Sequence, residues 1–293
     1  MQSTEFMGRQ GSLATTTFTT SAYVRPITST SIAVALSAVR SLNVRMTRRQ
    51  PAPWSRWSDE RLLALRFREL HLSRPAAWVE RCQKLLQLEL ADRALRVRPH
   101  VWLAEEWFSP RGIPGFAIPF YLAHPRLMQL ERSQMHMVEG GTPASCMAIM
   151  RHEAGHAIQH AHRLHRRARW RQLFGNSGAP YPECYRPRRN STRFVRHIPG
   201  WYAQSHPDED FAETFAVWLR PSSRWRTRYA RWPVALEKLT YVDALMDELR
   251  TVRPPVAERA KPHSIAQSSL TLGEHYRARR HAYRVTPAGW LSL

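Results

Sequence analysis

The spacing of apolar residues predicts a mostly helical protein with one short β-rich section. Ser58 suits an N-cap, and Leu62, Phe67 and Leu70 follow it with the spacing of one helix face. A second helix should begin after Pro75, where the helical spacing of apolar residues resumes. Further helices should begin at Thr142-Pro143 and at Ser205-His206-Pro207-Asp208, with Thr142 and Ser205 as the caps and a proline in the first turn of each. A final helix is expected over residues 234–249.

Between residues 97 and 130 the pattern changes to short apolar runs that prolines and glycines interrupt. Residues 101–103, 116–118 and 126–128 are candidate strands. The helix that follows Thr142 comes directly after this section. We therefore expect the α+β class, mostly helical, with a small mixed sheet beside that helix.

The composition divides the chain into three parts. Residues 1–48 are rich in serine and threonine, contain one acidic residue and show no helical or strand period, so we expect a disordered or mis-started extension. Residues 49–252 should fold as one domain. Residues 253–293 are polar and basic, which indicates a weakly ordered tail with room for one short helix. Within the domain, the Pro- and Arg-rich connection over 175–200 has the length of a functional or mobile loop.

The chain of 293 residues has a net charge of +21, with 44 Lys and Arg against 23 Asp and Glu. Such an excess can indicate nucleic acid or another anionic partner. The arginines are spread along the chain and lysines are few, as codon bias in a GC-rich genome would also produce. The charge therefore leaves both interpretations open.

The cysteines and the hydropathy bear on the compartment. Cys82, Cys146 and Cys184 form no C-x-x-C pair, so we expect free thiols, a reducing cytoplasmic location and no cysteine-bound metal. The chain has no run of the roughly 18 apolar residues that a membrane span requires.

Candidate chemistry lies in the helix after Thr142, at His152-Glu153-Ala154-Gly155-His156. Residues four apart share one helix face, so the two imidazoles can reach a single ion. Glu153 lies beside the first histidine, within reach of a water activated by that ion. This H-E-x-x-H pattern is typical of zinc hydrolases, which need a third protein ligand.

Two segments can supply the third ligand. His162 lies where a third histidine follows in some H-E-x-x-H enzymes, but Gln159 replaces the glycine that would turn the chain, so His162 should face away from the metal. We expect His160, His162 and His165 to form a solvated helix end. The other source is the helix after Pro207, where Glu209 and Glu213 are four residues apart and small residues allow a close approach.

Together, the H-E-x-x-H and the segment from Trp201 to Ala216 resemble the bacterial zinc-binding metallopeptidases. The resemblance covers most of residues 55–250, including Phe108-Ser109-Pro110 and the segment 118–125. The second segment is also similar to lethal-factor-type gluzincins, in which a tyrosine precedes the ligand glutamate by seven residues. The resemblance implies a zincin-like fold with Glu209 as a zinc ligand, Glu213 behind a ligand histidine, and Tyr202 at the site.

A zinc metallopeptidase is the function that these patterns favour. Its zinc, one per chain, would be bound by His152, His156 and Glu209. Glu153 would act as general base towards a peptide or protein substrate. By the resemblance, the Tyr202 hydroxyl would stabilise the oxyanion. His206 and Asp210 are reserve site residues.

Two alternatives stay open at this stage. One is a non-catalytic zinc-binding protein, in which a further residue such as His160 or Asp210 closes the fourth coordination position. The other is a protease recruited to nucleic acid by its basic surface. The oligomeric state is not indicated by the sequence.

Overall fold

The computed structural model describes residues 52–182 and 185–285. Contacts divide the chain into two units, residues 1–51 and residues 52–293. The predicted extension over 1–48 and Cys184 lie outside the described residues.

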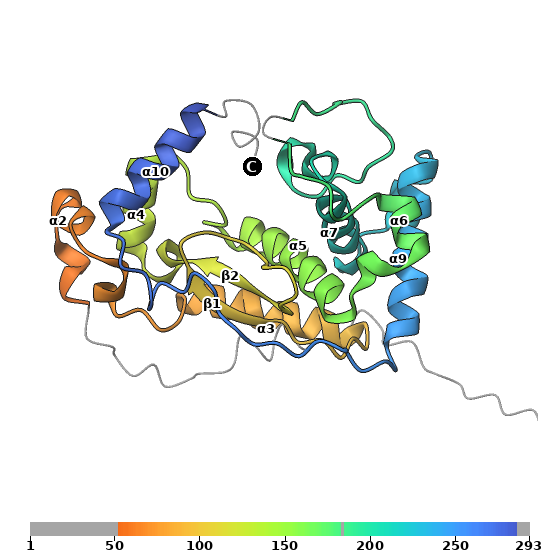
Figure 1. Ribbon diagram of the computed structural model, residues 1–293, viewed down its shortest axis with the longest axis horizontal. Helices are drawn as coiled ribbons and strands as arrows, with labels where there is room; N and C mark the ends of the chain where they lie inside the picture. Colours follow the sequence, from red (N-terminus) through yellow and green to blue (C-terminus); the bar gives the residue numbers. More distant parts are fainter. Residues whose placement is uncertain (1–51, 183–184, 286–293) are drawn as a thin grey trace, which may run out of the picture. The chain divides into compact units, whose positions relative to one another are not determined.

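The second unit is mostly helical (Figure 1). Its helices are α2 (Asp59–Leu63), α3 (Ala77–Asp92), α4 (Pro125–Met135), α5 (Pro143–His162), α6 (Ala168–Phe174), α7 (Pro207–Leu219), α8 (Trp225–Arg228), α9 (Pro233–Leu249) and α10 (Leu272–Val285). In the described part of this unit the strands are β1 (His100–Ala104) and β2 (Gly115–Pro119). Short 3-10 helices lie between several of these elements, among them η2 (Phe67–Leu70) and η5 (Pro199–Gln204).

The sheet consists of β1 and β2, which pair in parallel with Val101 opposite Phe116. An antiparallel bridge joins Phe108 to Ala117 of β2, in which the backbone N–H of Ala117 donates to the Phe108 carbonyl. The structure agrees with an α+β class, and the named strands form a parallel sheet where a mixed one was expected.

The expected strand over 126–128 is wrong, because these residues belong to α4. Pro125 occupies the first turn of α4, where its missing N–H costs no hydrogen bond. The Nδ1 atom of His124 accepts the backbone N–H of Arg126 and caps the helix. The expected helix from Ser58 to Leu70 is also divided, since α2 ends at Leu63 and η2 follows.

Helix α5 lies at the centre of the unit, packed against α7, α3 and β2 (Figure 1). Thr142 caps it through a side-chain hydrogen bond from the N–H of Ser145, as the sequence predicts. Every residue from His152 to Ala161 is buried. A helix buried on all sides has to provide partners for its polar side chains, so the titratable groups in this stretch need a specific role.

Helix α7 packs against α5 and is buried from Asp208 to Leu219. Its N-cap is His206, whose Nδ1 accepts the N–H of Asp208, and not Ser205 as the sequence suggests. Helix α9 packs on α7. The ion pair of Lys238 with Asp210, 2.5 Å long, joins these two helices inside the protein.

The C-terminal segment contains α10, which contacts α2 and α4. Leu272 and Tyr276 of α10 are buried, and Arg279 forms an ion pair with Glu131 of α4. This helix has 14 residues and is docked on the domain, so it is longer and better anchored than the short helix expected in a weakly ordered tail. The domain boundaries at 48 and 252 stay predictions.

Among the described residues, no helix combines the length and apolar character needed to cross a membrane.

Candidate metal centre

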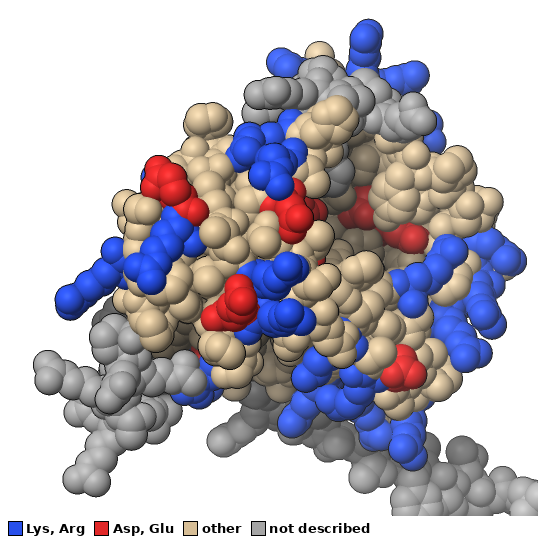
Figure 2. Space-filling view, turned by 60° about the vertical axis from the view of Figure 1, so that its left-hand side comes forward, with Lys and Arg blue, Asp and Glu red and all other residues tan. Residues whose placement is uncertain are grey.

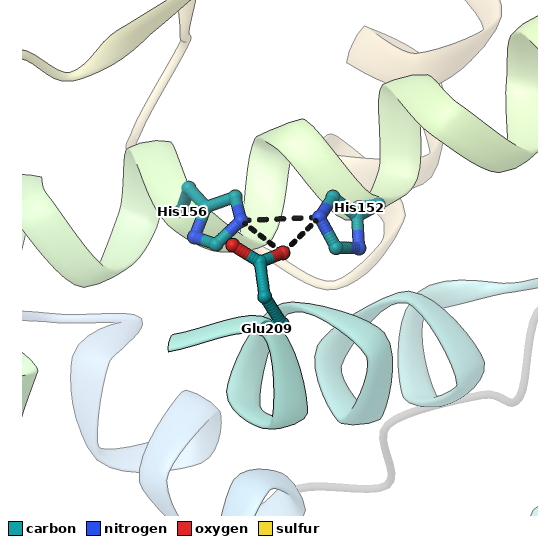
Figure 3. A group of neighbouring side chains, drawn as sticks. All are labelled: His152, His156 and Glu209. Atoms are coloured by element: carbon teal, nitrogen blue, oxygen red, sulfur yellow. Dashed lines mark hydrogen bonds and ion pairs between the residues drawn. The ribbon is translucent and has the colours of Figure 1, made fainter. Parts of the chain in front are cut away.

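Three predicted site residues meet between α5 and α7: His152 and His156 from the first helix and Glu209 from the second (Figure 3). The Oε2 atom of Glu209 lies 2.9 Å from Nε2 of His152 and 3.2 Å from Nε2 of His156. The two Nε2 atoms are 3.1 Å apart. All three side chains are buried. They are the group of histidine, cysteine and carboxylate residues that could hold a metal ion in the described part of the chain.

The close approach of the two helices depends on Gly155, which lies between the two histidines. A Cβ atom on Gly155 would be only 2.9 Å from the Cα atom of Ala212 on α7. The backbones can therefore come together only because residue 155 has no side chain. This contact brings the first turn of α7, with Glu209, against the His152 face of α5.

The His152 ring is oriented by Glu213, one turn beyond Glu209. Nδ1–H of His152 donates to Oε1 of Glu213 over 3.0 Å, which leaves Nε2 as the nitrogen that faces the site. The other carboxylate oxygen, Oε2, accepts the backbone N–H of Ile198 at 2.9 Å and that of His197 at 3.3 Å. A metal-binding histidine is usually held in this way by a carboxylate on its second nitrogen.

The charges around His152 and Glu209 stabilise positive charge between these two side chains. Burial lowers the pKa of His152, but hydrogen bonds and the negative charges of Glu209 and Glu213 outweigh it and raise the pKa well above its ordinary value. Burial raises the pKa of Glu209, yet the neighbouring histidines hold it well below its ordinary value. Both directions mean that this position suits a cation.

Glu153 is buried beside the two histidines, next to the Phe108-Ser109-Pro110 segment. The Ser109 hydroxyl donates to Oε2 of Glu153 over 2.9 Å. Burial raises the pKa of Glu153, while the neighbouring histidines and the Ser109 hydrogen bond oppose the shift. A carboxylate with a raised pKa takes up a proton more readily, as a general base requires.

Tyr202 lies on η5 with its ring centroid 5.6 Å from that of His152. Burial raises the pKa of its hydroxyl well above the ordinary value, so the hydroxyl keeps its proton. The two preceding residues, Gly200 and Trp201, both have positive φ, so η5 is kinked where it approaches His152.

The reserve residues are placed elsewhere. His206 caps α7 and its Nε2–H donates to the Ala179 carbonyl, while Asp210 is paired with Lys238. His160 is buried, so the expectation of a solvated helix end is wrong for this residue. Burial is the main cause that lowers the pKa of His160 to about 3, and the neighbouring His156 acts in the same direction. Among the described residues, neither His160 nor Asp210 joins the metal-binding group.

Helix α5 continues through Gln159 to His162, as the absence of glycine there predicts. The Gln159 amide donates to Oδ1 of Asp208 at the start of α7, so it adds to the contact between the helices. His162 is not part of the metal-binding group.

Sequence reasoning missed Tyr181, which lies in the long loop before α7. Its hydroxyl donates to Oε1 of Glu209 over 2.7 Å, and its ring stacks on His206 at a centroid distance of 3.9 Å. Tyr181 is 55% exposed, and its hydroxyl lies against the buried Glu209. Desolvation of the hydroxyl there, followed by the charge of Glu209, raises its pKa. The only signal in the sequence was the unusual length of this loop, which does not point to one residue.

Charge on the visible surface does not form a single patch. In Figure 2, lysine and arginine side chains lie in several separate groups, and acidic side chains line a hollow between them. The interpretation that the basic charge recruits nucleic acid therefore stays a prediction.

Comparison with known families agrees with the geometry. Residues 128–252, which include α5 and α7, match a family described as "Putative zinc-binding metallo-peptidase". This match confirms, over residues 128–252, the resemblance to zinc-binding metallopeptidases that the sequence indicates. Searches of curated proteins and of solved structures gave no match to the chain.

Proposed function

We propose that the protein is a zinc-dependent peptidase with His152, His156 and Glu209 as the metal ligands. The observation that carries the proposal is the convergence of two Nε2 atoms and one carboxylate oxygen within 2.9–3.2 Å of one another. Two imidazoles and one carboxylate are the ligand set of many catalytic zinc sites, and they leave a position for water. A zinc ion bound there would act as a Lewis acid and lower the pKa of a water towards about 7.

Glu153 is the proposed general base. It accepts a proton from the attacking water and returns it to the leaving nitrogen of the peptide. Ser109 supports this role because its hydroxyl holds one oxygen of the Glu153 carboxylate, at 2.9 Å. The low dielectric constant of the buried site strengthens this hydrogen bond.

Two further residues complete the proposed site. Glu213 keeps the His152 ring in one tautomer and one orientation through the 3.0 Å hydrogen bond to Nδ1. The Tyr202 hydroxyl keeps its proton, so it can donate a hydrogen bond to the oxyanion that forms on the substrate carbonyl.

We infer a zincin-like architecture of the gluzincin type. The H-E-x-x-H helix beside a small sheet, and a glutamate ligand from a later helix, support this proposal. Peptides or proteins are the proposed substrates. Cys82 and Cys146, which are free and buried, support a reducing compartment such as the cytoplasm.

Metal analysis tests the ligand set directly. The purified protein should contain about one zinc per chain. Glu209→Ala should lose the zinc, while Glu237→Ala should retain it, because Glu237 is an exposed residue that pairs with Arg169. Full zinc retention by Glu209→Ala would remove Glu209 from the site.

Cleavage of a complex peptide mixture tests the reaction. The wild-type protein should produce new peptide ends, and Glu153→Gln should keep its zinc but lose this activity because an amide cannot act as the base. An undiminished rate for Glu153→Gln would exclude the general-base role. Zinc without cleavage in the wild type would favour a non-catalytic zinc-binding protein.

A further inference from the structure

The two oxygens of Glu209 have different surroundings. Oε2 faces the histidines, at 2.9 Å from His152 and 3.2 Å from His156. Oε1 accepts the hydroxyl hydrogen of Tyr181 over 2.7 Å. A carboxylate can bind a metal through one oxygen or through both, and here a protein donor already occupies the second oxygen.

Tyr181 itself is held by a stack on the cap of α7. Its ring lies on the His206 ring at 3.9 Å with an interplanar angle of 11°. His206 is fixed at both nitrogens, since Nδ1 accepts the N–H of Asp208 and Nε2–H donates to the Ala179 carbonyl. The tyrosine ring therefore rests on a side chain that has little freedom to rotate.

The loop before Tyr181 is anchored to the same end of α7. The Ser177 hydroxyl donates to Oδ2 of Asp208 over 3.0 Å, and the Arg111 guanidinium donates to the Ser177 carbonyl over 2.8 Å. Gly175, with φ of 113°, lies against Pro207. These contacts position the loop over the first turn of α7, from which Glu209 projects.

We propose that Tyr181 is a positioning residue that fixes the Glu209 carboxylate, so that Oε2 alone is offered to the metal. This inference rests on the proposed metal site. Binding through one oxygen leaves room for water at a four-coordinate ion, whereas binding through both oxygens would fill a further position. Tyr181 thus favours the open coordination that hydrolysis requires.

Tyr181→Phe in the full chain is the test, because it removes the hydroxyl and keeps the ring that stacks on His206. Zinc affinity, measured by competition with a chromophoric chelator, should fall by about 10- to 100-fold, the usual effect of losing a group that orients a ligand. With Co²⁺ in place of zinc, the visible absorption bands should weaken, because five-coordinate Co²⁺ absorbs less than four-coordinate Co²⁺.

Tyr185→Phe is the matched control. Tyr185 lies in the same loop, and its hydroxyl donates to the Gly200 carbonyl and not to a metal ligand. This variant should bind zinc and cobalt as the wild type does. His206→Asn keeps a side chain that can cap α7 but removes the ring under Tyr181, so it should weaken zinc binding in the same direction. Should Tyr181→Phe fail to fold by circular dichroism, His206→Asn provides the comparison.

The outcomes separate this inference from the proposed function. If the wild type binds zinc and Tyr181→Phe has the same affinity and the same cobalt spectrum, the role of Tyr181 is overturned and the metal site stands. A loss of affinity with an unchanged cobalt spectrum overturns the claim of binding through one oxygen. If the wild type binds no zinc, the proposed function is overturned together with this inference.

Discussion

Replacing Gly155 with alanine should disturb the metal centre more than it disturbs the fold. The new Cβ would lie 2.9 Å from Cα of Ala212, 3.2 Å from its carbonyl oxygen and 3.3 Å from Cβ of Phe215. Carbon atoms in good contact are about 3.5–4.0 Å apart, so α5 and α7 would have to separate by roughly 0.6 Å or more. Metal–ligand distances tolerate changes of only about 0.2 Å.

The two effects on stability partly cancel. Crowding in a packed interior costs about 1–3 kcal/mol, and alanine is about 1 kcal/mol better than glycine inside a helix. The free energy of unfolding should therefore fall by about 0–2 kcal/mol. Zinc affinity should fall by about 10- to 100-fold, because Glu209 moves away from the two histidines with α7.

Chelator competition measures the affinity, and thermal unfolding in the presence of a strong chelator measures the stability of the metal-free chain. Gly273→Ala is the matched control, since its Cβ would lie 3.0 Å from the Leu63 carbonyl in the contact of α10 with α2. It should lower stability without weakening zinc binding.

A second variant tests which atoms are in the way. Adding Ala212→Gly to Gly155→Ala should not restore zinc affinity, because the closest atoms belong to the backbone of Ala212 and remain in place. Restored affinity in the double variant, or wild-type zinc affinity in folded Gly155→Ala, would refute the argument that helix separation controls the site.

Three further predictions concern neighbouring groups. The pKa of His160 is about 3 in the folded protein, below the ordinary 6.5, so burial of the neutral ring stabilises the fold above pH 6.5 and this contribution is lost as the pH falls towards 3. Between pH 7 and pH 4 the free energy of unfolding of His160→Gln, measured with denaturant, should therefore fall less steeply than that of the wild type. The difference should be up to about 1.4 kcal/mol per pH unit, and an equal fall in both proteins would contradict the lowered pKa of His160. Glu213→Gln should weaken zinc binding by about 10- to 100-fold through loss of the charged acceptor at Nδ1 of His152, and unchanged affinity in chelator competition would exclude that role. Ser109→Ala should lower kcat for peptide cleavage by about 3- to 10-fold at constant zinc content, because Glu153 loses one hydrogen bond. Ser109→Thr should restore the rate, and no rescue would point to a packing effect instead.

Local signals in the sequence were reliable where one cap or one period decides the structure. Thr142 caps α5 as predicted, and Val101 and Phe116 lie in the two strands. The strand expected over residues 126–128 is wrong because His124 and Pro125 start a helix there. These two start signals outweigh the short apolar run that follows them. A histidine cap was not anticipated, either there or at α7.

Burial was less predictable than helix position. His160 lies on a helix end rich in histidine and arginine, which indicates a solvated surface, yet the side chain is buried in the structure. The His165 ring lies 6.4 Å from the His160 ring and comes from beyond the end of the helix, so part of the surroundings of His160 lies outside the helical pattern. The same holds for Tyr181, whose contact with Glu209 depends on how a long loop is anchored.

By itself, the sequence determined that His152 and His156 share one helix face with Glu153 beside them, because a spacing of four residues closes one helical turn. Whether a third ligand reaches this helix face was decided by the tertiary structure. Glu209 lies 53 residues after His156. Only the packing of α7 against Gly155 brings its carboxylate within 3 Å of His152. Helix geometry is local and follows from spacing, whereas a ligand from a second helix depends on how closely two backbones can approach.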